Sequence, residues 1–196
     1  MDFCSIVTTG KARNDIPDFS GEKSETVEQA TIVFTDIVSS TDLVNRLGDA
    51  AARDIFRGHD KIIRNKLKKY KGTELQNLGD GFMLSFESAT LAIKCACAIQ
   101  REIAQNLPQI HIRIGINTGP VIGSIVGIHK YVYDIFGPGV NLAARMESLS
   151  ETMQITLCEE THRLINDEFL CTPRGEFEIK GFGHKQLYFL EREHER

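Results

Sequence analysis

Residues 30–41 read ATIVFTDIVSST, and the fold is predicted outward from this stretch. The β-branched and aromatic residues from Thr31 to Phe34 are typical of a buried strand. This strand leads into a carboxylate at Asp36, then into a hydroxyl-rich turn and a helix that begins at Thr41. A carboxylate beside a helix N-terminus can hold a hard cation next to an anion, which suits a nucleoside triphosphate. Taken alone, such a pattern is more often a helix cap or a solvated strand end.

Length and composition indicate one ordinary globular domain. The chain has 196 residues, of which 41% are hydrophobic and 26% charged, and its net charge is −4. Such a charge gives no sign of a nucleic-acid surface. No apolar run reaches the roughly 18 residues that a transmembrane helix needs, and the N-terminus lacks the pattern of a signal peptide. We therefore expect a protein without a membrane segment or a nucleic-acid partner.

The cysteines favour a reducing compartment. Their number is odd and no C-x-x-C pair occurs, so neither a disulfide framework nor a zinc site is indicated. Reduced thiols are the expected state, which predicts a cytoplasmic location. The cysteines are Cys4, Cys95, Cys97, Cys158 and Cys171.

The first half of the chain divides into a tail and a helix–hairpin region. Residues 1–29 are polar and are expected to form a flexible tail or linker, whereas residues 30–192 form the domain. A helical region over 41–70 is broken at Gly48, and His59 lies on its buried stripe as a packed, hydrogen-bonded histidine. Strands over 73–78 and 82–86 follow, joined by a Gly-Asp-Gly turn.

The second half continues the mixture of strands and helices. We expect a glycine-rich turn at 136–139 and a protruding arm at 129–133. Gly119-Pro120 is expected to turn between two strands. Since most neighbouring strands are linked as hairpins, the fold class is α+β, with a mostly antiparallel central sheet flanked by helices. The remaining elements are helices over 88–106, 140–148 and 159–165, and strands over 111–118, 121–128, 154–157, 169–179 and 186–190.

Two carboxylates are candidate metal ligands. Asp36 and Asp80 each lie at a turn after a predicted strand. If these strands are neighbours, the carboxylates converge and can hold two divalent cations, which polarise a phosphoryl group and activate an attacking oxygen. The alternative for Asp80 is an ordinary turn residue.

Other polar residues can serve a nucleotide. Asn141 and Arg145 share a helix face and can orient a ribose and stabilise a phosphoryl transition state. The alternative for Arg145 is a surface ion pair with Glu147 or another acid. Asp134 can accept a hydrogen bond from an exocyclic amine of a base, and the alternative is a turn carboxylate. Lys180 can bind a phosphate group, and the alternative is a solvated surface lysine.

Six stretches, in order, resemble the catalytic domain of class III nucleotidyl cyclases. Each stretch is weak alone, but the ordered set is specific and covers roughly residues 30–190. The resemblance implies a ferredoxin-like βαββαβ core. The stretches are FTDI (34–37), LGDGFM (78–83), RIGINTGPV (113–121), YDIFG (133–137), VNLAARM (140–146) and IKG (179–181).

The resemblance also implies a reaction and a set of roles. The 3′ oxygen of ATP would attack the α-phosphorus to give cyclic AMP and pyrophosphate, with two Mg²⁺ or Mn²⁺ ions as cofactors. The active site would be shared between two copies in a head-to-tail homodimer, with the 129–133 arm at the interface. The implied roles are metal binding for Asp36, Asp80 and the Ile37 carbonyl, adenine recognition for Asp134, ribose orientation for Asn141, transition-state stabilisation for Arg145 and triphosphate binding for Lys180.

One position departs from the family pattern. Where adenylyl cyclases of this family usually carry lysine and guanylyl cyclases glutamate, this chain has Gln76, whose amide can read either base. Asp134 still favours adenine, so an adenylyl cyclase is predicted. A guanylyl or dual-specificity cyclase is the first alternative, and a catalytically silent nucleotide-binding regulatory dimer is the second. A regulator, if there is one, is not identified by the sequence.

Overall fold

The computed structural model describes residues 26–126 and 132–194. Strands and helices interleave along them, as the hydrophobic patterns predict. The elements are β1 (Thr26–Ile37), α2 (Ser40–Leu47), α3 (Asp49–Tyr70), β2 (Thr73–Asn77), β3 (Gly81–Phe86), α4 (Ala89–Asn106), β4 (Ile112–Val126), β5 (Val132–Phe136), α5 (Pro138–Ser148), β6 (Ile155–Cys158), α6 (Glu159–Ile165), β7 (Phe169–Ile179) and β8 (Gly183–Glu193).

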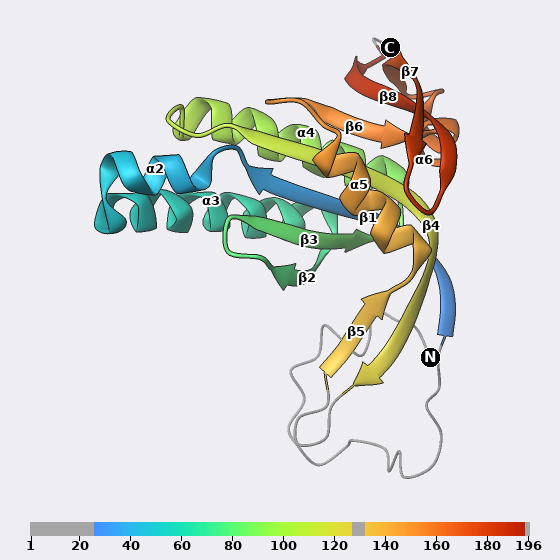
Figure 1. Cartoon of the computed structure of the whole chain (residues 1–196), viewed down its shortest axis with the longest axis horizontal. Helices are drawn as coiled ribbons and strands as arrows, with labels where there is room; N and C mark the ends of the chain where they lie inside the picture. The colour runs from blue at the N-terminus through green and yellow to red at the C-terminus, as the bar shows by residue number, and fades with distance from the viewer. Residues whose placement is uncertain (1–25, 127–131, 195–196) are drawn as a thin grey trace.

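A single open sheet forms the centre of the protein (Figure 1). Its strand order is β2-β3-β1-β4-β6-β8-β7, and β5 pairs with the far end of β4. Among the described strands only β4 and β6 run parallel. The predicted α+β class with a mostly antiparallel sheet flanked by helices is therefore confirmed.

Successive side chains of β1 point to opposite faces of the sheet, and each face has a hydrophobic core. Val33 points to the side covered by α3 and α4, and Ile32 points to the side crossed by α5 (Figure 1). Each is at most 1% exposed. Burying a side chain of this size stabilises the fold by about 1.5–3 kcal/mol, so β1 anchors both layers. Asp36 is four positions after Ile32 on the same strand, which places it on the α5 side.

The strand β1 begins earlier than the sequence suggested. Thr26 to Gln29 were assigned to the tail, but they pair with β4, with Thr26 opposite Gly123. The rest of the predicted tail lies outside the described residues. Residues 129–131 of the predicted arm also lie outside the described residues. The last two residues of the arm, Val132 and Tyr133, begin β5.

The turn predicted at Gly119-Pro120 is wrong, because β4 runs through both residues as one strand. Ala30 and Gln29 lie opposite them on β1. The amide of Thr118 points away from β1 and donates to the hydroxyl of Thr161 at 2.8 Å. Two residues later, the nitrogen of Pro120 faces the same way, so its missing hydrogen removes no bond to β1.

Glycines allow α5 to pack directly against the backbone of β4. A Cβ on Gly115 would lie 1.8 Å from the nitrogen of Glu147, near the end of α5. At the start of the helix, a Cβ on Gly139 would lie 2.6 Å from the carbonyl oxygen of Pro120. The Asn117 amide donates to the Gly139 carbonyl at 2.9 Å. Helix and strand therefore touch backbone to backbone at both ends of α5.

The helical region beginning at Thr41 was predicted to break at Gly48, and this is confirmed. Gly48 has φ +80°, which separates α2 from α3. His59 on α3 is fully buried, but neither ring nitrogen has a hydrogen-bond partner, so the expected hydrogen-bonded histidine is corrected. In the described part of the chain, no helix is both long and apolar enough to cross a bilayer.

Candidate active site

The backbone brings Asp36 and Asp80 to one end of the sheet. Asp36 ends β1 opposite Gly81, and the amide of Ile37 donates to the carbonyl of Asp80 at 3.0 Å. A Cβ on Gly81 would lie 2.0 Å from the Thr35 carbonyl oxygen, so only glycine permits this close approach. The strands β1 and β3 are therefore neighbours, which is the condition under which the two carboxylates were expected to converge.

The first turn of α2 fixes the second carboxylate. The hydroxyl of Ser40 donates to Oδ2 of Asp80 at 2.6 Å. Hydrogen bonds to a charged acceptor are stronger than neutral ones, so this contact restrains the carboxylate. The positive end of the helix dipole also favours negative charge here.

Arg113 and Glu147 also belong to this end of the sheet, although the sequence assigned them no role. Nη2 of Arg113 donates to Oδ2 of Asp36 at 2.7 Å and lies 3.1 Å from Oε1 of Glu147. The side chains of Asp36, Arg113 and Glu147 are 27%, 32% and 14% exposed, respectively. Glu147 therefore pairs with Arg113, rather than forming the surface ion pair considered for Arg145.

The pKa shifts show how closely these charges are packed. Burial raises the pKa of Glu147; Arg113 counteracts this, and the carboxylates of Asp36 and Asp80 add to the increase. The hydrogen bond to Asp36 is the main reason that the pKa of Arg113 is raised. Two acidic groups, Asp36 and Glu147, thus contact one guanidinium, with Asp80 close enough to add to the repulsion at Glu147. A cation would relieve this repulsion.

The donor set fits a hard divalent cation, as the family resemblance implies. Asp36 and Asp80 offer carboxylate oxygens, and Ile37 offers a main-chain carbonyl, which are donors that Mg²⁺ and Mn²⁺ prefer. Across residues 26–126 and 132–194, no cluster of three or more His, Cys, Asp or Glu side chains is arranged to hold a metal. Two carboxylates and one carbonyl are fewer ligands than the about six that Mg²⁺ takes, so a cation here would need further oxygen ligands.

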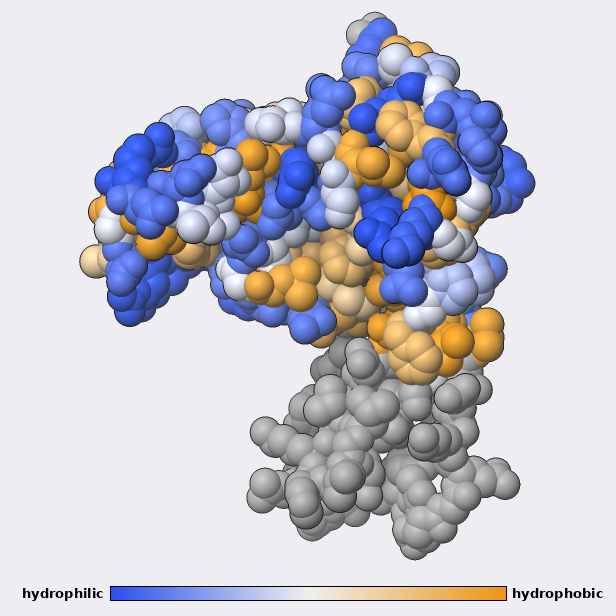
Figure 2. Space-filling model, viewed as in Figure 1, coloured by the Kyte–Doolittle hydropathy of each residue, from blue (hydrophilic) through white to orange (hydrophobic). Residues whose placement is uncertain are grey.

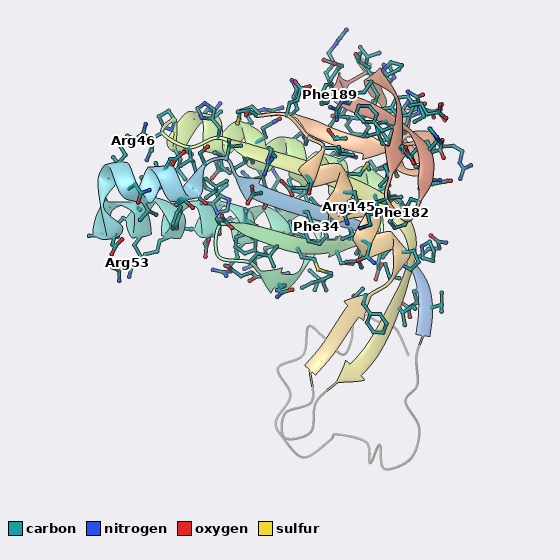
Figure 3. The ribbon with its side chains drawn as sticks, in the orientation of Figure 1. Phe34, Arg46, Arg53, Arg145, Phe182 and Phe189 are labelled. Atoms are coloured by element: carbon teal, nitrogen blue, oxygen red, sulfur yellow. The ribbon has the colours of Figure 1, made fainter. Side chains whose placement is uncertain are left out.

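The other predicted residues lie apart from these carboxylates. Asn141 and Arg145 are exposed on the outer side of α5, and Figure 3 places Arg145 on the same face of the sheet as Phe34. Gln76 is exposed on β2, and Lys180 is exposed in the β7–β8 turn. In the part of the chain that the structure describes, no hydrogen bond or ion pair joins any of the four to Asp36 or Asp80.

Asp134 is placed only by its backbone. It lies in β5 opposite Ser124 of β4. Its side chain is outside the described part of the structure, so its predicted contact with a base stays a prediction.

A cavity of about 810 Å³ lies away from the carboxylates and is lined in part by Thr31, Asn117, Gly139, Leu142 and Lys185. It lies beside the N-terminal half of β1, whereas Asp36 is near the C-terminal end of that strand. Neither Asp36 nor Asp80 lines this cavity.

Comparison with known proteins identifies the family. Residues 22–192 match the adenylate and guanylate cyclase catalytic domain. An adenylate cyclase of Mycobacterium tuberculosis is 28% identical over 177 residues, covering 83% of this chain and 39% of that protein. Receptor-type guanylate cyclase gcy-8 of Caenorhabditis elegans is 30% identical over 187 residues, covering 85% of this chain and 16% of that protein. The chain thus spans less than half of either relative.

Solved structures of both kinds of cyclase are similar to this chain. The adenylyl cyclase CyaB from P. aeruginosa superimposes with a TM-score of 0.82 at 29% identity, over 86% of this chain and 96% of that one. The guanylate cyclase domain of RhGC from Catenaria anguillulae, in complex with GTP, gives 0.81 at 25% identity, over 86% and 100%. With the family match, these similarities show that the chain belongs to the class III adenylyl and guanylyl cyclase catalytic domains.

Proposed function

We propose that the protein is an adenylyl cyclase, which converts ATP to 3′,5′-cyclic AMP and pyrophosphate at a site shared by two copies. One observation carries the proposal. Asp36 and Asp80 adjoin through paired backbone at the end of β1, whereas Asn141 and Arg145 are presented outward on α5. A second copy that turns its α5 toward Asp36 would complete one site and, by symmetry, a second.

The exposed hydrophobic surface supports such a dimer. Figure 2 shows hydrophobic side chains gathered where β5 and the start of β1 leave the body of the protein. Val27 and Phe136 in this region are 69% and 39% exposed. Large exposed apolar side chains in one area are typical of an interface between proteins.

The carboxylate half of the site handles the triphosphate. Asp36, Asp80 and the Ile37 carbonyl would hold two divalent cations, with Ser40 orienting Asp80. Bound cations supply polarisation of the α-phosphoryl group and a more nucleophilic 3′ oxygen. Because the residues are fixed on adjacent strands, they need little reorganisation on binding.

The partner half positions the ribose and stabilises charge. Asn141 would orient the ribose so that its 3′ oxygen lies in line with the α-phosphorus. The bond from the 3′ oxygen to phosphorus forms, the bond to pyrophosphate breaks, and the 3′ hydroxyl proton is lost. Arg145 would stabilise the charge that develops on the phosphoryl oxygens, and Lys180 would bind the triphosphate.

The choice of base rests on Asp134 and Gln76. A carboxylate at Asp134 would accept from the adenine amino group, which favours ATP. A guanylyl or dual-specificity cyclase is the second candidate, because Gln76 is uncharged and its amide can pair with either purine. The intact set of Asp36, Asp80 and Arg145 argues against a catalytically silent regulatory dimer.

A cyclase assay on the purified chain tests substrate and assembly together. Cyclic nucleotide production should be measured with ATP and with GTP in the presence of Mn²⁺, across a range of protein concentrations. ATP should be preferred, and activity per chain should rise with concentration because the dimer is the active form. A preference for GTP would overturn the adenylyl assignment, and no product alongside ATP binding would favour the silent dimer.

Mixing of inactive variants tests the shared site. A chain with Asp36→Ala and a chain with Arg145→Ala should each be inactive, but one site of each mixed dimer is intact. Random mixing should therefore restore about a quarter of the wild-type activity. The matched control mixes Asp36→Ala with Asp80→Ala, which damages the same half in both chains and should restore none.

A further inference from the structure

Arg113 occupies one of the two oxygens through which Asp36 could bind a cation. Its Nη2 contacts the Oδ2 of Asp36 at 2.7 Å. A cation that binds Oδ2 would displace this contact, and the guanidinium charge opposes a cation at either oxygen. The question is where the guanidinium then goes.

Glu147 offers the alternative contact, and the present arrangement leaves it incomplete. Oε1 of Glu147 lies 3.1 Å from Nη2, yet it has no hydrogen bond of its own. Nε of Arg113 is also buried without a hydrogen-bond partner. A buried polar atom without a hydrogen bond costs free energy. The Nε of Arg113 and the Oε1 of Glu147 could therefore gain from a closer pairing with each other.

The side chain, not the helix, has to move. Gly115 lies against the backbone of Glu147, so strand β4 and this end of α5 cannot approach more closely. Arg113 is two residues before Gly115 on the same strand. The exchange therefore requires rotation of side chains rather than movement of the helix.

We propose that Arg113 is a positioning residue that exchanges between Asp36 and Glu147, holding Asp36 when no cation is bound and pairing fully with Glu147 when one is. The proposal rests on the proposed function, because it takes Asp36 as a ligand of the divalent cation. Arg113 competes with the cation for Asp36, and Glu147 lowers the cost of displacing it. The pair thereby sets cation affinity without touching the nucleotide.

Binding of Mn²⁺ tests the exchange without turnover. Free Mn²⁺ can be followed by electron paramagnetic resonance with the full chain, alone and with α,β-methylene-ATP, which cannot be cyclised. Arg113→Gln should bind Mn²⁺ about fivefold more tightly, because the competing charge is gone. Glu147→Gln should bind it about fivefold more weakly, because Arg113 then remains on Asp36.

A double-mutant cycle separates exchange from long-range charge. In the Arg113→Gln background, Glu147→Gln should have a clearly smaller effect than in wild type, since no guanidinium is left to displace. Arg113→Lys should stay near wild type, because the competing charge remains. Arg163→Gln removes an arginine that pairs with Glu160 on α6 and should leave affinity unchanged. Thermal unfolding and dimer content should be measured for every variant. If one of the single variants fails to fold, the double variant can still be measured, because it removes the charges of Arg113 and Glu147 together.

The outcomes distinguish the two proposals. If Arg113 only orients Asp36, Arg113→Gln will bind Mn²⁺ more weakly than wild type. Glu147→Gln will then change the affinity equally in wild type and in Arg113→Gln. Either result overturns the exchange. If wild type binds no Mn²⁺ with or without the analogue, the proposed metal role of Asp36 fails and the exchange fails with it. Cyclase activity of wild type with Mn²⁺ shows separately whether the proposed function holds.

Discussion

Asp36 lies directly opposite Gly81 in the ladder between β1 and β3. The next residue, Ile37, bonds through its amide to the carbonyl of Asp80. The relative positions of the Asp36 and Asp80 backbones are therefore set by paired strands.

Replacing Gly81 with alanine should damage both stability and the site. The new methyl group would lie 2.0 Å from the Thr35 carbonyl oxygen, which forces β1 and β3 apart. We expect a loss of about 1–3 kcal/mol in unfolding free energy, measured by urea denaturation, together with weaker Mn²⁺ binding.

Gly58→Ala is the matched control for this substitution. Gly58 is inside α3, and its added methyl would meet only the flexible end of Leu107 at 3.3 Å. Alanine is also a better helix former than glycine, so stability should be unchanged or higher. Equal losses for both variants would contradict the role given to the close contact at Gly81.

Burial of His59 should make stability fall in mildly acidic solution. Burial lowers its pKa below 6.5, although the neighbouring Asp60 partly counteracts this. A folded-state pKa below the unfolded value gives stability that is present above pH 6.5 and is lost as pH falls, because unfolding releases an imidazole that takes up a proton. Urea denaturation at pH 7.5, 6.5 and 5.5 should show this loss.

The variant His59→Leu isolates that contribution. Its unfolding free energy should fall less between pH 7.5 and 5.5, by up to about 1.4 kcal/mol per pH unit relative to wild type. His111→Gln should keep the wild-type slope, since that side chain is at the surface. Parallel slopes for wild type and His59→Leu would show that His59 does not cause the acid sensitivity.

Changes at Gln76 should shift the choice of base. A glutamate side chain at this position would not donate to adenine N1 but would accept from the guanine amide and amine. The substitution Gln76→Glu should therefore raise the GTP-to-ATP ratio of kcat/KM by about tenfold or more. Gln76→Lys should lower the ratio. Both can be measured by product analysis with the two nucleotides.

Gln29→Glu serves as the control for added charge on an exposed strand residue. Gln29 is exposed near the other end of the sheet, on β1. The ratio should stay at the wild-type value. If Gln76→Glu also leaves it there, Gln76 does not contact the base.

Local signals predicted where Asp36 and Asp80 lie relative to their strands. A β-branched run ending in Asp36 and a Gly-Asp-Gly turn at Asp80 each specify their own backbone conformation within a few residues. The structure adds their adjacency in the sheet and their contacts with Arg113 and Ser40. The roles of exposed residues such as Asn141 rest mainly on the family resemblance and stay predictions.

Long-range pairing explains what the sequence could not show. Pro120 resembles a turn residue until Gln29 is known to lie opposite it on β1. Arg113 alternates with the buried Ile112 and Ile114, so its face was readable, but its partner Glu147 lies 34 residues further along the chain. Contacts at such separations depend on the whole topology rather than on any local window.

The seating of α5 has a consequence for assembly. The helix meets β4 through Gly139 at its start and through the Gly115 contact near its end. Asn141 and Arg145 are therefore carried on a backbone that is already rigid in the single chain. At this helix, the association that we propose would have to immobilise side chains only, because the entropy of ordering the helix backbone is lost during folding.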